Sequence, residues 1–144
     1  MARVSLYLNF MGNTEEAFTF YKSLFGGEFT SLQRMHEVPP MPGGPELPEH
    51  EREKIMHVEL PIMGGVVLMA TDMLESMGHS LRIGNNVTIN LEPDTYAEGS
   101  RLFDALAEGG SDCQPLTPMF WGSSWGVVLD RFGIRWMVNC PNPE

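Results

Sequence analysis

The sequence is poor in cysteine and in basic residues, and each shortage excludes a class of protein. Only two of the 144 residues are cysteine, Cys113 and Cys140, which is too few for a disulfide framework or a cysteine-rich metal cluster. We expect both to be buried, free thiols. Nine Lys and Arg residues stand against nineteen Asp and Glu residues, so the formal net charge is −10. Because phosphate binding depends on clustered Lys and Arg side chains, nucleic acid is not expected as a partner.

Long apolar runs are also missing. No window approaches the ~18 uninterrupted apolar residues that a membrane span needs, so no membrane partner is expected. Residues 1–5 lack the apolar segment and small-residue cleavage site of a secretion signal, which predicts a cytoplasmic location. The apolar share of 42% is that of an ordinary globular protein, and residues 1–144 are expected to form one domain with a core of its own.

What the sequence does contain is one order of elements that occurs twice. A strand over residues 4–10 precedes a helix with Asn13 or Thr14 as its N-cap, an apolar face through 17–25 and an end at Gly26-Gly27. Three strands are then predicted, near 29–35, 55–61 and 66–71. At an offset of about 83 residues the order begins again. The second set comprises a strand at 86–92, a helix at 97–107, and strands near 113–115, 126–130 and 135–140.

This repetition predicts an α+β fold of two tandem βαβββ modules. One helix covers only one face of a sheet, so each module should keep a curved, mixed sheet with its helix on the outer face. Two such modules can close a cleft between their concave sides. The boundaries expected are about 1–75 for the first module, 76–85 for a linker and 86–140 for the second module.

Several stretches of the sequence resemble the PhnB-like branch of the vicinal-oxygen-chelate superfamily, which includes glyoxalases, bleomycin-resistance proteins and dioxygenases. They are YLNFMGN at 7–13, EA at 16–17, FY at 20–21, IMHVEL at 55–60, LMATD at 68–72, RLF at 101–103, GG at 109–110, and MFWG at 119–122 followed by Gly126, Asp130, Phe132-Gly133 and Trp136. The resemblance implies paired βαβββ modules, a homodimer and a ligand cleft inside each curved sheet, and it leaves open whether modules are exchanged between chains. A ubiquinone-pathway methyltransferase activity is also attached to such sequences, yet no glycine-rich cofactor loop follows the first strand.

The resemblance further implies four metal-ligand positions, one from each of four strands, which metal-dependent relatives fill with His, Gln and Glu. Aligned on this sequence they are Leu6, Met69, Thr88 or Asn90, and Met137. An aliphatic side chain cannot bind a metal, and a thioether is a poor ligand for hard or borderline ions. We therefore predict that the chain holds no metal and needs no cofactor.

Alternation along the strands predicts which polar side chains line the cleft. The set comprises His57, Glu59, Thr71, Thr88, Asn90, Glu92, Arg135 and Asn139, with Met69 and Met137 on the cleft floor. Trp121 and Trp125 are expected either to cap an apolar ligand or to pack at a module or dimer interface. The same alternation also fits a sheet with one face in water. His57 and Glu59 are the candidate catalytic pair, because two residues apart on one strand they are neighbours and suit general base and acid roles. Arg135 is expected either to pair with Glu92 or to hold a ligand carboxylate or phosphate.

Three functions follow from these residues. The first is a metal-free small-molecule-binding protein whose ligand is unknown. The second is a metal-independent lyase or isomerase that uses His57 and Glu59, and the third is a metal-dependent glyoxalase or dioxygenase. Residues 39–48 hold five prolines and two glycines and are expected to be either a lid over the cleft or an insertion. The other histidines are expected in solvent-exposed loops. They are His36, His50 and His79.

Overall fold

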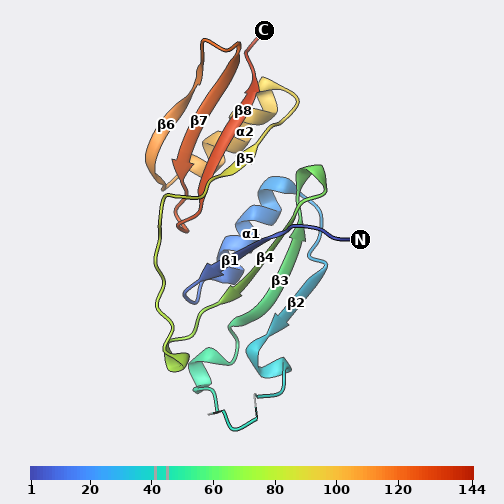
Figure 1. Ribbon diagram of the computed structural model, residues 1–144, viewed down its shortest axis with the longest axis vertical. Coiled ribbons are helices and arrows are strands. Elements are labelled where there is room, and N and C mark those ends of the chain that lie inside the picture. The colour runs from blue at the N-terminus through green and yellow to red at the C-terminus, as the bar shows by residue number, and fades with distance from the viewer. Residues whose placement is uncertain (41, 45) are drawn as a thin grey trace. The chain divides into compact units, whose positions relative to one another are not determined.

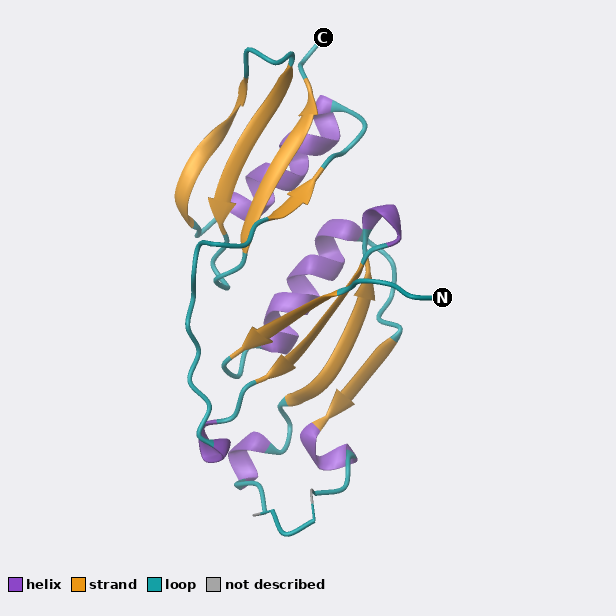
Figure 2. Ribbon diagram, viewed as in Figure 1, coloured by secondary structure: helices purple, strands orange, loops and turns teal. Residues whose placement is uncertain are grey.

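The computed structural model describes residues 1–40, 42–44 and 46–144. The chain divides into two compact units, Met1–Arg82 and Ile83–Glu144, and each unit has one helix packed on one face of a four-stranded sheet (Figures 1 and 2). Met41 and Pro45, in the stretch 39–48 that was expected to be a lid or an insertion, lie outside the described residues. No helix in the described ranges has both the length and the apolar character needed to cross a membrane.

The first unit runs strand, helix, three strands, as its sequence predicts. Its elements are β1 (Leu6–Phe10), α1 (Thr14–Phe25), β2 (Ser31–Arg34), β3 (Ile55–Pro61) and β4 (Val67–Asp72). The strand order is β1-β4-β3-β2, with β1 parallel to β4 and the other pairs antiparallel. Short 3-10 turns connect these elements at Met35–Glu37, Glu49–Glu51, Met63–Gly65 and Glu75–Met77.

The second unit repeats this order. Its elements are β5 (Ile89–Leu91), α2 (Tyr96–Ala107), β6 (Ser111–Pro118), β7 (Ser123–Leu129) and β8 (Arg135–Pro141). The strand order is β5-β8-β7-β6, again with the first and last strands of the unit parallel. The α+β class and the tandem βαβββ architecture are therefore correct, while β5 is shorter and β6 longer than predicted. Proline residues within β6 do not interrupt it because β6 is the edge strand of its sheet.

Each core lies between the helix and the facing side of its sheet. Phe18 and Tyr21 of α1 are fully buried together with Leu60 and Leu68 of the sheet. In the second unit the fully buried apolar residues include Leu102 and Leu106 of α2 and Val128, Trp136 and Val138 of the sheet. Burying a large apolar side chain contributes roughly 1.5–3 kcal/mol, so these faces fix which side of each strand remains uncovered. Both cysteines are free, but Cys113 is exposed, which corrects the expectation that both would be buried.

The start of α1 is held by a residue from a distant strand, contrary to prediction. Asn13 stands at the N-cap position without a side-chain capping bond, and Thr14 is the first helical residue. Asp72 at the end of β4 caps the helix, since its Oδ1 accepts hydrogen bonds from the Gly12 and Thr14 amides at 3.0 Å each and from Thr14 Oγ1 at 2.7 Å. Its Oδ2 accepts from the Ile55 amide at 2.8 Å. One buried carboxylate thus ties α1, β3 and β4 together.

Candidate functional site

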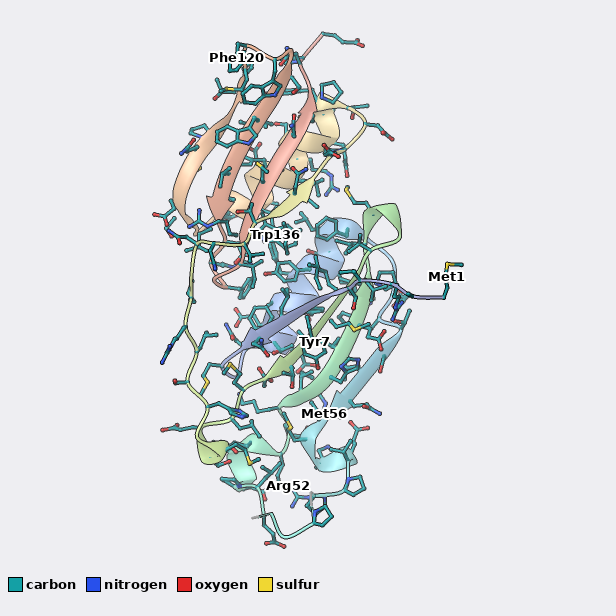
Figure 3. All side chains as sticks on the ribbon, in the orientation of Figure 1. Met1, Tyr7, Arg52, Met56, Phe120 and Trp136 are labelled. Atoms are coloured by element: carbon teal, nitrogen blue, oxygen red, sulfur yellow. The ribbon has the colours of Figure 1, made fainter. Side chains whose placement is uncertain are left out.

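We call the side of each sheet that its helix does not cover the open face. The register of the parallel strands shows which residues occupy the centre of each open face. Tyr7 lies beside Met69 in the first unit, and Asn90 lies beside Met137 in the second. Leu6 instead pairs with Leu68, which is fully buried on the helix side. The alignment that assigned Leu6 to the first ligand position was therefore wrong by one residue. Tyr7, labelled in Figure 3, shares the open face with Met69, its partner in the register.

A hydrogen-bonded chain of three side chains crosses the open face of the first sheet. The Tyr7 Oη lies 3.0 Å from His57 Nδ1, and His57 Nε2 lies 2.9 Å from Glu59 Oε2. The two rings are also stacked, with centroids 5.6 Å apart. An ionised Glu59 only accepts hydrogen bonds, which assigns the proton to Nε2 and leaves Nδ1 to accept the phenol O–H. Glu59 therefore fixes the tautomer and orientation of His57.

The groups around the Tyr7 hydroxyl keep it protonated. Partial burial raises the pKa of Tyr7, the hydrogen bond with Thr71 lowers it, and the negative charge of Glu59 raises it again. A protonated phenol in this position can donate a hydrogen bond to a ligand oxygen or pass a proton to it. Tyr7 is 48% exposed, so a ligand on the open face can reach it.

The open face of the second sheet combines aromatic, thioether and amide groups. Trp125 Nε1 donates to Met137 Sδ at 2.7 Å, and Ser123 Oγ donates to Asn139 Oδ1 at 2.8 Å. Trp121 meets Trp125 edge to face with ring centroids 6.4 Å apart, and Trp121 remains 47% exposed. Both predicted aromatic caps are thus in contact with each other.

Arg135 lies on the same face as Met137 and Asn139, at the start of β8. Its Nη2 contacts Asp112 Oδ2 at 3.3 Å, so the ion pair is with Asp112 and not with Glu92. Glu92 is exposed and follows the end of β5, and Thr88 precedes its start.

The remaining histidines lie near chain turns, at different depths. The His50 side chain is well exposed, while His36 is partly covered and approaches Glu53 at 3.5 Å. His79 is exposed and its Nδ1 accepts from the Leu74 amide at 3.0 Å. Within the part of the chain that the structure describes, no three His, Cys, Asp or Glu side chains are grouped so that they could hold a metal ion.

The side chains at the central open-face positions do not fit the metal of the vicinal-oxygen-chelate fold. They supply a phenol from Tyr7, an amide from Asn90 and thioethers from Met69 and Met137. Thioethers favour soft ions over Mn²⁺, Zn²⁺ or Fe²⁺, and the partial burial that raises the pKa of Tyr7 opposes the phenolate form. This donor set is suited to contacts with an organic ligand.

A cavity of about 380 Å³ lies at another place in the first unit, by the N-terminal end of α1. Its charged lining groups already have protein partners. The Arg34 guanidinium forms a two-point contact with the Glu15 carboxylate at 3.0 and 2.6 Å, and Lys54 Nζ donates to the Gly12 carbonyl at 2.9 Å. Asp72 is fully engaged in capping. None of the predicted site residues lines this cavity.

Among the open-face residues that were not predicted from the sequence, Tyr7 and Asp112 matter most for the site. Tyr7 was missed because the first strand was aligned one residue out of phase, although its alternation with the buried Phe10 carried the signal. Asp112 was missed because the strand was expected to begin at Cys113. A bulged register near the start of β6 leaves no regular alternation from which its neighbour could be inferred.

Residues 2–139 match the sequence profile of a family described as 3-demethylubiquinone-9 3-methyltransferase. The chain is 38% identical to the crystallised protein PA1353 from Pseudomonas aeruginosa, with a TM-score of 0.83 and coverage of 99% of this chain and 100% of that one. It is similar in fold to a putative 3-demethylubiquinone-9 3-methyltransferase, PhnB protein, from Bacillus cereus (24% identity, TM-score 0.78, 96% and 99% covered). The fold alone is shared with the fosfomycin resistance protein FosX from Listeria monocytogenes (11%, 0.63, 99% and 94%). The chain therefore belongs to the PhnB-like family that this profile describes.

Proposed function

We propose that this chain is a metal-free, small-molecule-binding protein that works as a cytoplasmic homodimer and holds its ligand on the open faces of its sheets. The observation that carries the proposal is the donor chemistry at the centre of each open face: a phenol and a thioether from Tyr7 and Met69 on the first sheet, and an amide and a thioether from Asn90 and Met137 on the second. Such groups recognise an organic molecule by hydrogen bonds and van der Waals contact and do not require a metal to do so.

The open faces support binding because their polar groups are held in place before any ligand arrives. Glu59 orients His57, which accepts the Tyr7 hydroxyl, and Ser123 orients Asn139. Groups held in this way lose little further conformational entropy on binding. Exposed aromatic rings beside them, such as Trp121, offer apolar contact area.

The methyltransferase activity in the family's description is not favoured by the start of α1. The connection from β1 to α1, Met11 to Asn13, contains a single glycine. The amides of Gly12 and Thr14 at the helix N-terminus already bind the carboxylate of Asp72. A nucleotide cofactor with a carboxylate or phosphate would have to displace this internal anion from the place where helix dipoles bind anions.

A metal-independent lyase or isomerase is the second candidate. The hydrogen-bonded side chains of Glu59, His57 and Tyr7 favour this candidate. The carboxylate of Glu59 orients the imidazole of His57, and an imidazole in contact with a phenol can move a proton. In such an enzyme a substrate oxygen replaces His57 as the acceptor of the Tyr7 proton, and His57 takes a proton from the substrate. The third candidate, a metal-dependent glyoxalase or dioxygenase, lacks the donors at the central positions.

Metal analysis and a ligand screen together test the proposal. Protein purified without chelator is expected to hold far less than one equivalent of Zn, Mn, Fe or Ni, and a library of metabolites is expected to contain a compound that raises the melting temperature. A ligand present at 100 times its Kd stabilises the protein by about 2.7 kcal/mol. One equivalent of metal that is lost in Tyr7→Phe or in Asn90→Ala would refute the proposal.

Single substitutions test whether the ligand binds to the open face of the first sheet or to the helix on its other side. Tyr7→Phe is expected to weaken binding of the compound found, whereas Glu16→Gln, an exposed change on α1, is expected to leave it unchanged. An enzymatic function gains support if the bound compound is converted by the wild type and not by His57→Gln. A library in which no compound shifts the melting temperature would count against the proposal.

A further inference from the structure

Arg135 forms an incomplete ion pair, unlike Arg101 in the same unit. Arg101 engages Glu98 through Nε at 2.9 Å and Nη2 at 2.6 Å, so both oxygens of the carboxylate are used. Arg135 reaches Asp112 through Nη2 alone, at 3.3 Å. The Arg135 side chain is only 14% exposed, and its Nε is the one buried side-chain nitrogen or oxygen in the described ranges that has no hydrogen-bond partner.

This orphaned donor indicates a missing acceptor. Leaving a buried N–H without a partner costs free energy that a structural ion pair normally avoids. Nε and the neighbouring Nη2 form the edge of the guanidinium that matches the two oxygens of a carboxylate. In the structure, Nε makes no hydrogen bond and Nη2 holds a long, weak contact with Asp112.

The contact of Asp112 with Arg135 has features that would let a ligand carboxylate replace it. Its side chain is 66% exposed, so solvent offers its carboxylate an alternative partner. Its φ of 50° makes it the only residue other than glycine with positive φ within the described ranges, and this conformation costs energy for a side chain to adopt. Asp112 also lies in the bulged part of β6, where the ladder constrains it least.

The surroundings of Arg135 indicate what accompanies the incoming carboxylate. Leu129 of β7 lies opposite Arg135 of β8. On the same face, the next pair consists of two apolar side chains, and the pair after it consists of an aromatic side chain and an amide. We call these three cross-strand pairs the Arg135 ladder; they are Arg135–Leu129, Met137–Val127 and Asn139–Trp125. Arg135 and Asn139 are four positions apart on one strand, which is a span of ~13 Å at about 3.3 Å per residue.

We infer that the Arg135 ladder is the binding site for a small organic monocarboxylate with an apolar body. The carboxylate displaces Asp112 and takes both Nε and Nη2 of Arg135, while the body lies along Val127 and Met137 toward Trp125. The net charge of −10 favours a monoanion over a phosphate dianion, because each further negative charge adds repulsion. The inference rests on the proposed function and deepens it by naming the class of ligand and its anchor.

Three matched probes test the chemistry of the ligand. We would titrate 4-phenylbutanoate, 4-phenylbutanol and 3-phenylpropylphosphonate into ¹⁵N-labelled full-length protein, and follow the Arg135 Nε–Hε signal by NMR, assigned by its loss in Arg135→Gln. The carboxylate is expected to bind at least about tenfold more tightly than the alcohol, since a charge-assisted pair is worth that much. It should also bind more tightly than the phosphonate. Equal binding of acid and alcohol would overturn the inference, and tighter binding of the phosphonate would overturn the choice of a carboxylate.

Two variants should change affinity in opposite directions. Arg135→Gln is expected to weaken 4-phenylbutanoate binding about tenfold or more, whereas Asp112→Asn is expected to strengthen it about threefold, because the internal competitor and its charge are removed. Arg101→Gln, which makes the same charge change on α2, should have no effect. If Asp112→Asn weakens binding, Asp112 is part of the ligand site and the displacement is refuted.

These experiments distinguish a failure of the carboxylate-site inference from a failure of the proposed binding function. Binding that shifts signals of Tyr7 and His57 but not of Arg135 refutes only the present inference, because the ligand then uses the first sheet. Absence of binding by all three probes also refutes it, while the metabolite screen continues to decide the proposed function. Melting temperatures of all variants show whether a loss of binding reflects a loss of folding.

Discussion

Tyr7 differs from the other open-face residues because three neighbouring influences act on one ionisable group. Its hydroxyl contacts His57 Nδ1 at 3.0 Å, and its pKa responds to burial, to Thr71 and to the charge of Glu59. Burial and Glu59 both oppose the phenolate, whereas the Thr71 hydrogen bond favours it. These influences have opposite signs, so single substitutions can separate them.

We predict that Glu59→Gln lowers the pKa of Tyr7 and that Thr71→Val raises it. Removing the carboxylate removes a negative charge that repels the phenolate, and removing the Thr71 hydroxyl removes a hydrogen bond that stabilises it. In the wild type the phenol should titrate above its ordinary pKa, and it should stay above that value in Glu59→Gln because burial persists. Tyrosine ¹³Cζ chemical shifts measured against pH give each value directly. A Tyr7 titration that is identical in all three proteins would mean that the hydrogen-bonded chain does not form in solution.

Among the elements, the start of α1 depends on β4 for its capping. Asp72 accepts four hydrogen bonds, three from Gly12 and Thr14 at the helix start and one from Ile55, the first residue of β3. A helix N-terminus carries partial positive charge and unpaired amides, so a buried carboxylate there satisfies donors and opposes the dipole at once. The contact closes the first unit across 58 residues of sequence.

We predict that Asp72→Asn destabilises the protein by about 3 kcal/mol, because the amide keeps one acceptor oxygen but loses the charge and turns N–H donors against the helix amides. Urea unfolding followed by circular dichroism measures the loss. Asp94→Asn, the same change at an exposed position, should alter the free energy of unfolding by less than about 0.5 kcal/mol. Equal effects of the two substitutions would show that the Asp72 contacts contribute nothing specific.

The capping of α1 also shows which features can be predicted from sequence at this scale. The period of Ala17, Phe18 and Tyr21 predicts the helix, and Gly26 predicts its end, because both signals are local. The capping residue is not local, since no pattern near residue 14 points to position 72. The faces of β3 and β8 were likewise predicted correctly from alternation, whereas β1 was assigned out of phase because its buried side is anchored mainly by Phe10.

For the molecule as a whole, repetition was the strongest signal. The same order of strands and helix, spaced about 83 residues apart, predicted two modules whose sheets have equivalent strand orders. The pairing of Arg135 with Asp112 could not be predicted, because it depends on a bulge in β6. The module boundaries, the dimer and the role of residues 39–48 remain predictions.

The charge balance of the whole molecule leads to a last prediction, an increase of melting temperature with salt. If each of the nine basic residues were paired with one acidic residue, ten acidic residues would still be unpaired, so repulsion among them should outweigh the attraction within ion pairs. Salt screens both repulsion and attraction over about 8–10 Å at physiological strength, but exposed ion pairs such as Lys22–Glu28 contribute only about 0–1 kcal/mol each. Melting curves at pH 7 in increasing NaCl, repeated in KCl to exclude an ion-specific effect, measure the balance. A melting temperature that falls with salt would mean that the few ion pairs, Arg34–Glu15 foremost among them, outweigh the general repulsion.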